Sequence, residues 1–160
     1  VFFFIRFEDI QTSYPKDLNV LKMAYCNPKI HSLIGALPLF KQLHTLVISL
    51  NNERTSDNIV KLSKVISSVV NLRSLLIQSS SIHVLPESFV PLNQILNFHL
   101  DFDKLESIPP SIGKFTNIQE LYLRCQAFTL PNEIKELHRL TCLHINCTRL
   151  LSISSNVLSG

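Results

Sequence analysis

An internal repeat of 22 to 23 residues runs through most of this sequence. Leu or Ile followed by Pro recurs at Leu85, Ile108 and Leu130, in steps of 23 and 22 residues. Each pair is preceded by an apolar triplet whose second and third members follow the first by three and five residues. The triplets are Leu72, Leu75 and Ile77; Ile95, Phe98 and Leu100; Ile118, Leu121 and Leu123; and a further copy at Leu140, Leu143 and Ile145. Looser copies that begin at Leu18 and Leu43 bring the candidate units to six.

The triplets predict short strands. Numbering each unit from the first member of its triplet places the apolar residues at positions 1, 4 and 6. Side chains alternate between the two faces of a strand, so positions 4 and 6 enter a core while positions 5 and 7 face outward. One unit cannot bury its apolar face alone, whereas stacked units share a core and pair their backbones. We therefore expect parallel strands over residues 72–77, 95–100, 118–123 and 140–145, in one curved sheet.

The segments between the strands carry helical signals. Each Leu-Pro or Ile-Pro pair is followed by apolar residues at helical spacing, as in Ile112 and Phe115 after Pro109, which fits a helical turn or two. Proline is tolerated there because the first turn of a helix needs no amide donor. The unit from Leu43 to Leu72 is longer, at 29 residues. A longer helix is predicted within it by an apolar stripe of Ile59, Leu62, Ile66 and Val69.

The combined pattern of L-x-x-L-x-L, an apolar anchor and L-P-x-x-I-x-x-L resembles the leucine-rich repeats of plant disease-resistance proteins and of Ras-pathway scaffold proteins. The resemblance implies an α/β solenoid, with a curved parallel sheet on its concave side and short helices and loops on its convex side. Residues 18–160 would form an array of about six units, the last incomplete, and residues 1–17 an N-terminal cap or the tail of an earlier repeat. Because no polar cap follows the last unit, we expect a fragment of a longer protein.

One position departs from the pattern of that family. The family usually places there an Asn whose side chain bonds successive backbones in an inner ladder. This chain keeps Asn at Asn51 and has Ser80, Asp103, Gln126 and Thr148 at the corresponding positions of later units. All four side chains can form hydrogen bonds, so we expect an inner ladder that is present but less regular.

Composition and charge argue against several classes of function. The formal net charge is +3 and no run of Lys or Arg occurs, so charge does not suggest a nucleic-acid partner. The apolar stretch from Val1 to Ile5 is far shorter than the roughly 20 residues of a membrane span, and we expect no such span. With Gly35, Gly113 and Gly160 as its 3 glycines, the chain cannot form a glycine-rich phosphate loop, and we expect no cofactor.

The four cysteines, Cys26, Cys125, Cys142 and Cys147, form neither a C-x-x-C pair nor a dense disulfide framework. We expect reduced thiols in a cytoplasmic protein, with a disulfide between Cys125 and Cys147 as a geometrically conceivable alternative. The spacing also argues against a metal site. Cys125 with His144 is the one pair to consider for nucleophilic catalysis, but an open strand surface excludes water poorly and offers no oxyanion site. We therefore expect no enzyme activity from this chain.

Binding residues are expected on the outward strand positions, which we take to be 5, 7 and 8 together with 2 and 3. In the C-terminal half these positions carry aromatic, imidazole and guanidinium groups, which are enriched at binding hot spots. A generic solvated face with no dedicated partner is the alternative. The candidate protein-binding residues, expected to form one contiguous patch, are His99, Phe102, Tyr122, Arg124 and His144.

The repeat and its outward residues predict a protein-protein interaction module. The resemblance implies the recognition part of an intracellular sensor, receptor or scaffold in a signalling protein, with a protein ligand on the concave face. The alternatives are the substrate-recognition arm of a larger enzyme, such as a ubiquitin ligase, kinase or phosphatase, and an extracellular receptor ectodomain. The sequence that flanks this chain in its parent protein would separate the three.

Overall fold

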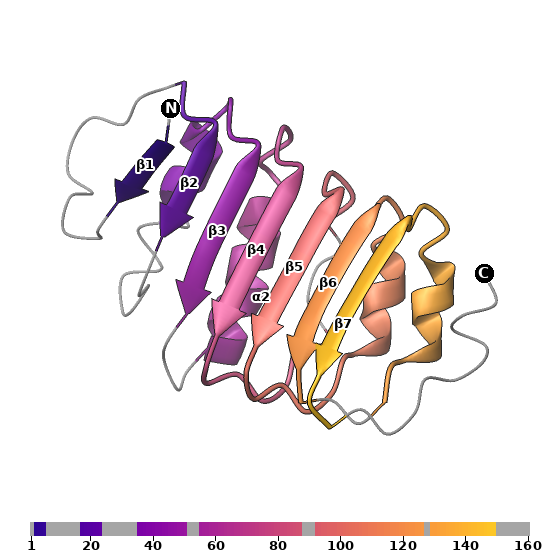
Figure 1. Cartoon of the computed structure of the whole chain (residues 1–160). Coiled ribbons are helices and arrows are strands. Elements are labelled where there is room, and N and C mark those ends of the chain that lie inside the picture. The colour runs from indigo at the N-terminus through magenta and orange to yellow at the C-terminus, as the bar shows by residue number, and fades with distance from the viewer. Residues whose placement is uncertain are drawn as a thin grey trace.

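The computed structural model describes residues 2–5, 17–23, 35–50, 55–87, 92–126 and 129–149, with only the backbone of residues 2–5 and 55–58. Within this part of the chain, seven strands lie side by side in sequence order in one sheet, and short helices cover one of its faces (Figure 1). Every pairing is parallel. The strands are β1 (Phe2–Ile5), β2 (Val20–Met23), β3 (Thr45–Leu50), β4 (Ser74–Ser79), β5 (Asn97–Phe102), β6 (Glu120–Cys125) and β7 (Cys142–Cys147).

The sheet register follows the sequence repeat, since residues at the same position of successive units pair with each other. At position 4, Leu75 pairs with Phe98, Phe98 with Leu121, and Leu121 with Leu143. Each unit therefore adds one strand to the edge of the sheet and one layer to the core. The predicted solenoid with one parallel sheet is confirmed.

The strands begin two residues later than the triplets predict, at position 3 instead of position 1. The reason is the turn that closes the preceding segment. The amide of Leu72 donates to the carbonyl of Val69 over 3.0 Å, and the amide of Ile118 donates to that of Phe115 over 3.1 Å. The position-1 side chains Leu72 and Ile118 are buried core anchors, but their backbones belong to turns.

The helical segments lie behind the sheet. Helix α2 (Thr55–Ile66) occurs where the long unit predicts it, and its stripe at Ile59, Leu62, Ile66 and Val69 is buried. The shorter units hold short 3-10 helices, η3 (Pro110–Lys114) and η4 (Asn132–Glu136), and η2 (Leu37–Leu39) precedes β3. Five residues are too few for a stable α-helix, and the tighter turn is the usual form of such short connections.

One continuous core lies between the sheet and the helical segments, formed by inward strand residues and helical anchors. The rings of Phe98 in β5 and Phe115 after η3 stack with their centroids 5.2 Å apart, which joins the sheet to the convex layer. The apolar residues that follow β4 and β5, Ile82 and Leu105, are buried. Phe128 and Leu150 hold the equivalent place in the next two units and lie outside the described residues.

Backbone amides form inner-ladder bonds at Asp103 and Thr148, whereas the amide of Gln126 donates to the carbonyl of Leu105 instead, so the ladder is less regular, as expected. The amides of Asp103 and Thr148 donate to the carbonyls of Ser79 and Cys125, each over 3.1 Å. Asn51 lies outside the described residues. The carboxylate of Asp103 turns outward to an arginine, so it does not take the place of the family's Asn.

A second row of hydrogen bonds, which the repeat did not predict, joins the units just before their strands. The side-chain amide of Asn71 donates to the carbonyl of Lys41 over 2.7 Å, and that of Asn117 donates to the carbonyl of Asn93 over 2.8 Å. The residue before position 1 supplies the donor in both units. These bonds tie the turns together, so the strand ends are held at this edge as well.

Candidate functional site

An open hollow of about 590 Å³ crosses the sheet on the face that carries no helices. We call this hollow the concave groove. It runs across the strands from β2 to β7, and outward side chains at positions 3 and 5 form its floor. The position-5 residues of that floor are Lys22, Val47, Leu76, His99, Tyr122 and His144.

Three rings form a continuous row in the C-terminal half of the groove. His99, Tyr122 and His144 pair in register on β5, β6 and β7. The ring centroids of His99 and Tyr122 are 3.8 Å apart with a 49° tilt, and those of Tyr122 and His144 are 6.0 Å apart with a 39° tilt. The separation of Tyr122 and His144 lies in the range where tilted rings attract one another, and His99 and Tyr122 are in direct contact. The structure thus brings together three of the five predicted binding residues.

Burial lowers the pKa of His99 below its ordinary value of 6.5. The carboxylate of Asp101 on the same strand works in the opposite direction, and the neighbouring imidazole of His144 lowers the pKa further. Desolvation is the largest of these effects because it penalises the charged form of a histidine. His99 is therefore a neutral ring at pH 7.

A row of polar side chains runs parallel to the rings at position 7. The hydroxyl of Ser49 donates to Gln78 Oε1 over 3.1 Å, and Gln78 Nε2 donates to Asp101 Oδ2 over 3.2 Å. Asp101 Oδ1 accepts from Arg124 Nη1 over 3.1 Å, and Arg124 Nη2 lies 3.1 Å from Asp103 Oδ1. Arg124 is thus at the edge of the predicted patch, with its guanidinium group shared between two carboxylates.

Position 3 adds an acidic group to the floor of the groove. Asn97 Nδ2 donates to Glu120 Oε2 over 2.6 Å, and this contact is exposed to solvent. Glu120 lies two residues before Tyr122 on β6, so both side chains point from the same face of the strand. At the next strand, the thiol of Cys142 lies 3.1 Å from His144 Nε2.

Phe102 does not belong to this surface, and its prediction as an outward residue is wrong. Its side chain is 0% exposed and lies in the core. The reason is that the strand continues through position 8, where the alternation that buries positions 4 and 6 turns the side chain inward again. The same holds for Leu50, Ser79 and Cys125 at position 8 of their units, all of which are buried.

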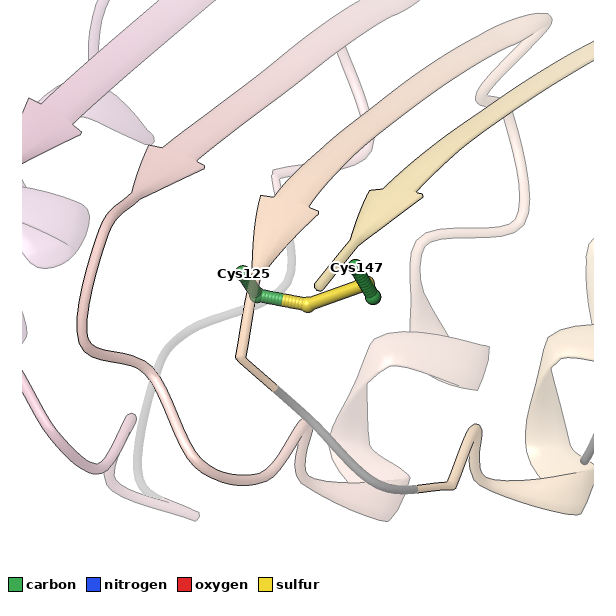
Figure 2. Close-up of a disulfide and its surroundings, with 2 residues drawn as sticks. All are labelled: Cys125 and Cys147. Atoms are coloured by element: carbon green, nitrogen blue, oxygen red, sulfur yellow. A yellow bond between two sulfur atoms is a disulfide. The ribbon is translucent and has the colours of Figure 1, made fainter. Parts of the chain in front are cut away.

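The two position-8 cysteines of β6 and β7 are joined in a disulfide, as Figure 2 shows. Cys125 and Cys147 pair in register, with their Cα atoms 4.7 Å apart. The expectation of reduced thiols is therefore wrong for these two residues, and the alternative pairing is correct. Because Cys125 has no free thiol, it cannot form a nucleophile with His144. Cys142 is the free cysteine among the described residues.

The described residues contain no group of three or more His, Cys, Asp or Glu side chains that could hold a metal ion. Among the same residues, no helix is long and apolar enough to cross a membrane.

The sequence reasoning missed four residues that shape the groove. Val47 and Leu76 form its apolar middle, Glu120 supplies a carboxylate to its floor, and Asp101 supplies one to the adjoining row at position 7. All four occupy outward positions 3, 5 or 7, so the alternation itself was the signal that could have identified them. Their chemistry was overlooked because hot-spot composition favours aromatic and basic residues over aliphatic and acidic ones.

No protein-family model and no curated protein sequence matches this chain. Solved structures do match it. A leucine-rich-repeat (LRR) protein of Leptospira interrogans superimposes with a TM-score of 0.65 and 27% identity, covering 89% of this chain and 35% of that one. The plant peptide hormone receptor RGFR1, solved in complex with RGF2, matches with a TM-score of 0.51 and 20% identity, covering 88% of this chain and 29% of that one. The chain thus spans about a third of the length of either structure.

Proposed function

We propose that this chain, which has the fold of the leucine-rich-repeat structures that it matches, is the recognition module of a larger protein and that its concave groove binds an extended segment of another protein. Repeat solenoids present extended concave surfaces of this kind to their partners. The catalytic or signalling activity of the parent protein would then reside outside these residues.

The observation that carries the proposal is the row of rings formed by His99, Tyr122 and His144. The inward positions of the same strands hold the core, so these rings contribute large amphipathic surfaces to the groove instead. Tyrosine in particular is enriched among the residues that dominate binding energy.

The test is to capture a partner with the parent protein and to measure its affinity for substituted chains. Tyr122→Ala should weaken binding by about 2 kcal/mol or more if the tyrosine is a hot spot. Lys114→Ala, at an exposed convex residue at the end of η3, is the control and should leave the affinity unchanged. If the convex substitution abolishes binding while Tyr122→Ala has no effect, the concave groove is not the binding surface.

A second candidate, the ectodomain of an extracellular receptor, is favoured by the disulfide between Cys125 and Cys147. Disulfides persist in oxidising compartments and are rare in the cytoplasm. A cytoplasmic sensor, scaffold or enzyme arm would keep both thiols reduced. Alkylation of the protein in its native cells before lysis, followed by mass spectrometry of the two cysteines, distinguishes these locations.

A further inference from the structure

We propose that the concave groove selects a partner segment that places a Lys or Arg side chain over Tyr122, beside the carboxylate of Glu120. The inference rests on the proposed function and adds the chemistry of the partner. It follows from the charge, the ring geometry and the apolar middle of the groove.

The charge around Tyr122 is negative. Glu120, Asp101 and Asp103 are three carboxylates, and the single guanidinium of Arg124 bonds two of them. Within the described part of the chain, the Lys or Arg residue that lines the groove is Lys22 on β2. Four strand spacings, or about 19 Å, separate β2 from β6, which exceeds the screening length of about 8 Å at physiological ionic strength. A cation over Tyr122 therefore meets net attraction.

Glu120 is held in position for such a contact. Its Oε2 atom accepts the hydrogen bond from Asn97, while its Oε1 atom has no partner among the described residues. A carboxylate fixed by one hydrogen bond loses little side-chain entropy when it takes a second one. Charge-assisted hydrogen bonds to Lys or Arg are about twice as strong as neutral ones.

The rings beside Glu120 suit the same cation. An ammonium or guanidinium group within about 6 Å of an aromatic centroid is attracted to the ring face. The 49° and 39° tilts keep the rings from stacking flush, so part of the Tyr122 surface stays open to the groove. His99 does not oppose the cation at pH 7, because burial lowers the pKa of its imidazole and keeps the ring neutral.

The apolar middle of the groove favours a second feature of the partner segment, an apolar residue near its Lys or Arg. Leu76 on β4 lies two strands from Tyr122, or about 10 Å away, and Val47 lies on the next strand. A chain in the polyproline II conformation advances about 3.1 Å per residue with three residues per turn, so side chains three residues apart point to the same side. A segment that crosses the strands would therefore place an apolar side chain over Leu76 about three residues from its basic residue.

The first experiment selects binders for the full chain from a displayed library of short random linear peptides. The expected result is enrichment of peptides in which a Lys or Arg stands about three residues from an apolar residue, with binding lost in Tyr122→Ala. Enrichment of acidic or uncharged peptides that also require Tyr122 would overturn this inference and leave the proposed function standing. Binders that are insensitive to Tyr122→Ala, or no binders at all, would overturn both.

The second experiment measures a selected basic peptide against charge variants. Glu120→Gln keeps an acceptor for Asn97 but removes the charge, and should weaken binding roughly three- to tenfold. Glu106→Gln, which changes the net charge equally at an exposed residue outside the groove, should have no effect. Arg124→Gln should strengthen binding, because it releases two carboxylates from their internal cation. Equal affinities in Glu120→Gln and Glu106→Gln, with unchanged melting temperatures, would refute the role of Glu120.

Discussion

The ring of His99 lies 3.8 Å from the ring of Tyr122, centroid to centroid, on the adjacent strand. Each ring limits the rotamers of the other, so the C-terminal half of the concave groove is ordered before a partner arrives. Less entropy is then lost on binding. His99 is also partly buried, and this burial lowers its pKa, so we expect the stability of the chain to respond to pH.

Stability should fall as the pH falls below about 6.5, because of His99. Burial lowers the pKa of this histidine in the folded chain, with Asp101 opposing the effect and His144 adding to it. As the pH falls, the unfolded chain therefore binds a proton first, and proton binding favours unfolding. The full stability is present above the ordinary pKa and is partly lost as the pH falls through the lowered value. Melting temperatures from about pH 8 to about pH 5 should decline less in His99→Gln than in the unsubstituted chain. An equal decline in both would contradict the prediction.

Phe102→Ala should lower the stability of the chain. Removing this fully buried ring leaves a cavity between the sheet and the convex layer, at a cost of about 3–5 kcal/mol. Chemical denaturation measures the loss. Lys104→Ala, at an exposed neighbour, should change stability by less than about 0.5 kcal/mol. If Phe102→Ala unfolds no more easily than Lys104→Ala, the inward placement of position 8 is incorrect.

Gly113→Ala should destabilise the stack of convex turns. A Cβ at this residue in η3 would lie 2.6 Å from the backbone oxygen of Glu133 in the next unit, so the two turns would have to separate. Overpacking of this kind costs about 1–3 kcal/mol. Gly35→Ala is the matched control, because nothing lies within 4 Å of its added Cβ. Urea unfolding of both variants compares the two sites, and equal stabilities would argue against close contact between η3 and η4.

Reduction of the disulfide should destabilise the chain. The bond links residues 22 positions apart, and closing a loop of that size stabilises a fold by roughly 3 kcal/mol. A thermal melt with and without a thiol reductant measures the effect. Cys142→Ser, which removes the cysteine that takes no part in the bond, should melt like the unsubstituted chain under both conditions. A melting temperature unaffected by reductant would show that the bond contributes nothing.

The repeat predicted the sheet and its register because both follow from where apolar residues recur. Leu75, Phe98, Leu121 and Leu143 pair as their common position requires. The residue at which each strand begins is harder to predict from the sequence. Leu72, for example, is apolar and buried whether its backbone belongs to a strand or to a turn. The turn is decided by its bond to Val69, which no pattern of hydrophobicity records.

The candidate site was only partly predictable. The sequence predicts that His99, Tyr122 and His144 lie side by side, because outward residues at the same repeat position of adjacent units become neighbours. The prediction for Phe102 is wrong because β5, and with it the alternation of side chains, continues through position 8. The pairing of Arg124 with Asp101 and Asp103 depends on rotamers and cross-strand distances, which a single sequence does not contain.

The spacing of the cysteines in the sequence does not by itself predict whether they form a disulfide. Cys125 and Cys147 stand at the same position of successive units, which brings them together, but the absence of a familiar cysteine motif argued for free thiols. The register of the sheet makes the disulfide possible, because in-register residues on parallel strands lie within the Cα separation that a disulfide requires. Equivalent positions in neighbouring repeats are therefore the place to look for such bonds in other stacked sheets.

The alternation along each strand separates two kinds of residue that evolution or an engineer can change independently. Tyr122 faces the groove, while its sequence neighbours Leu121 and Leu123 are buried in the core. The outward side chains can thus be substituted without changing the core residues that stabilise the fold. Each repeat contributes its own outward residues to the groove, so the binding surface can be changed one repeat at a time. The protein stays folded after each such change.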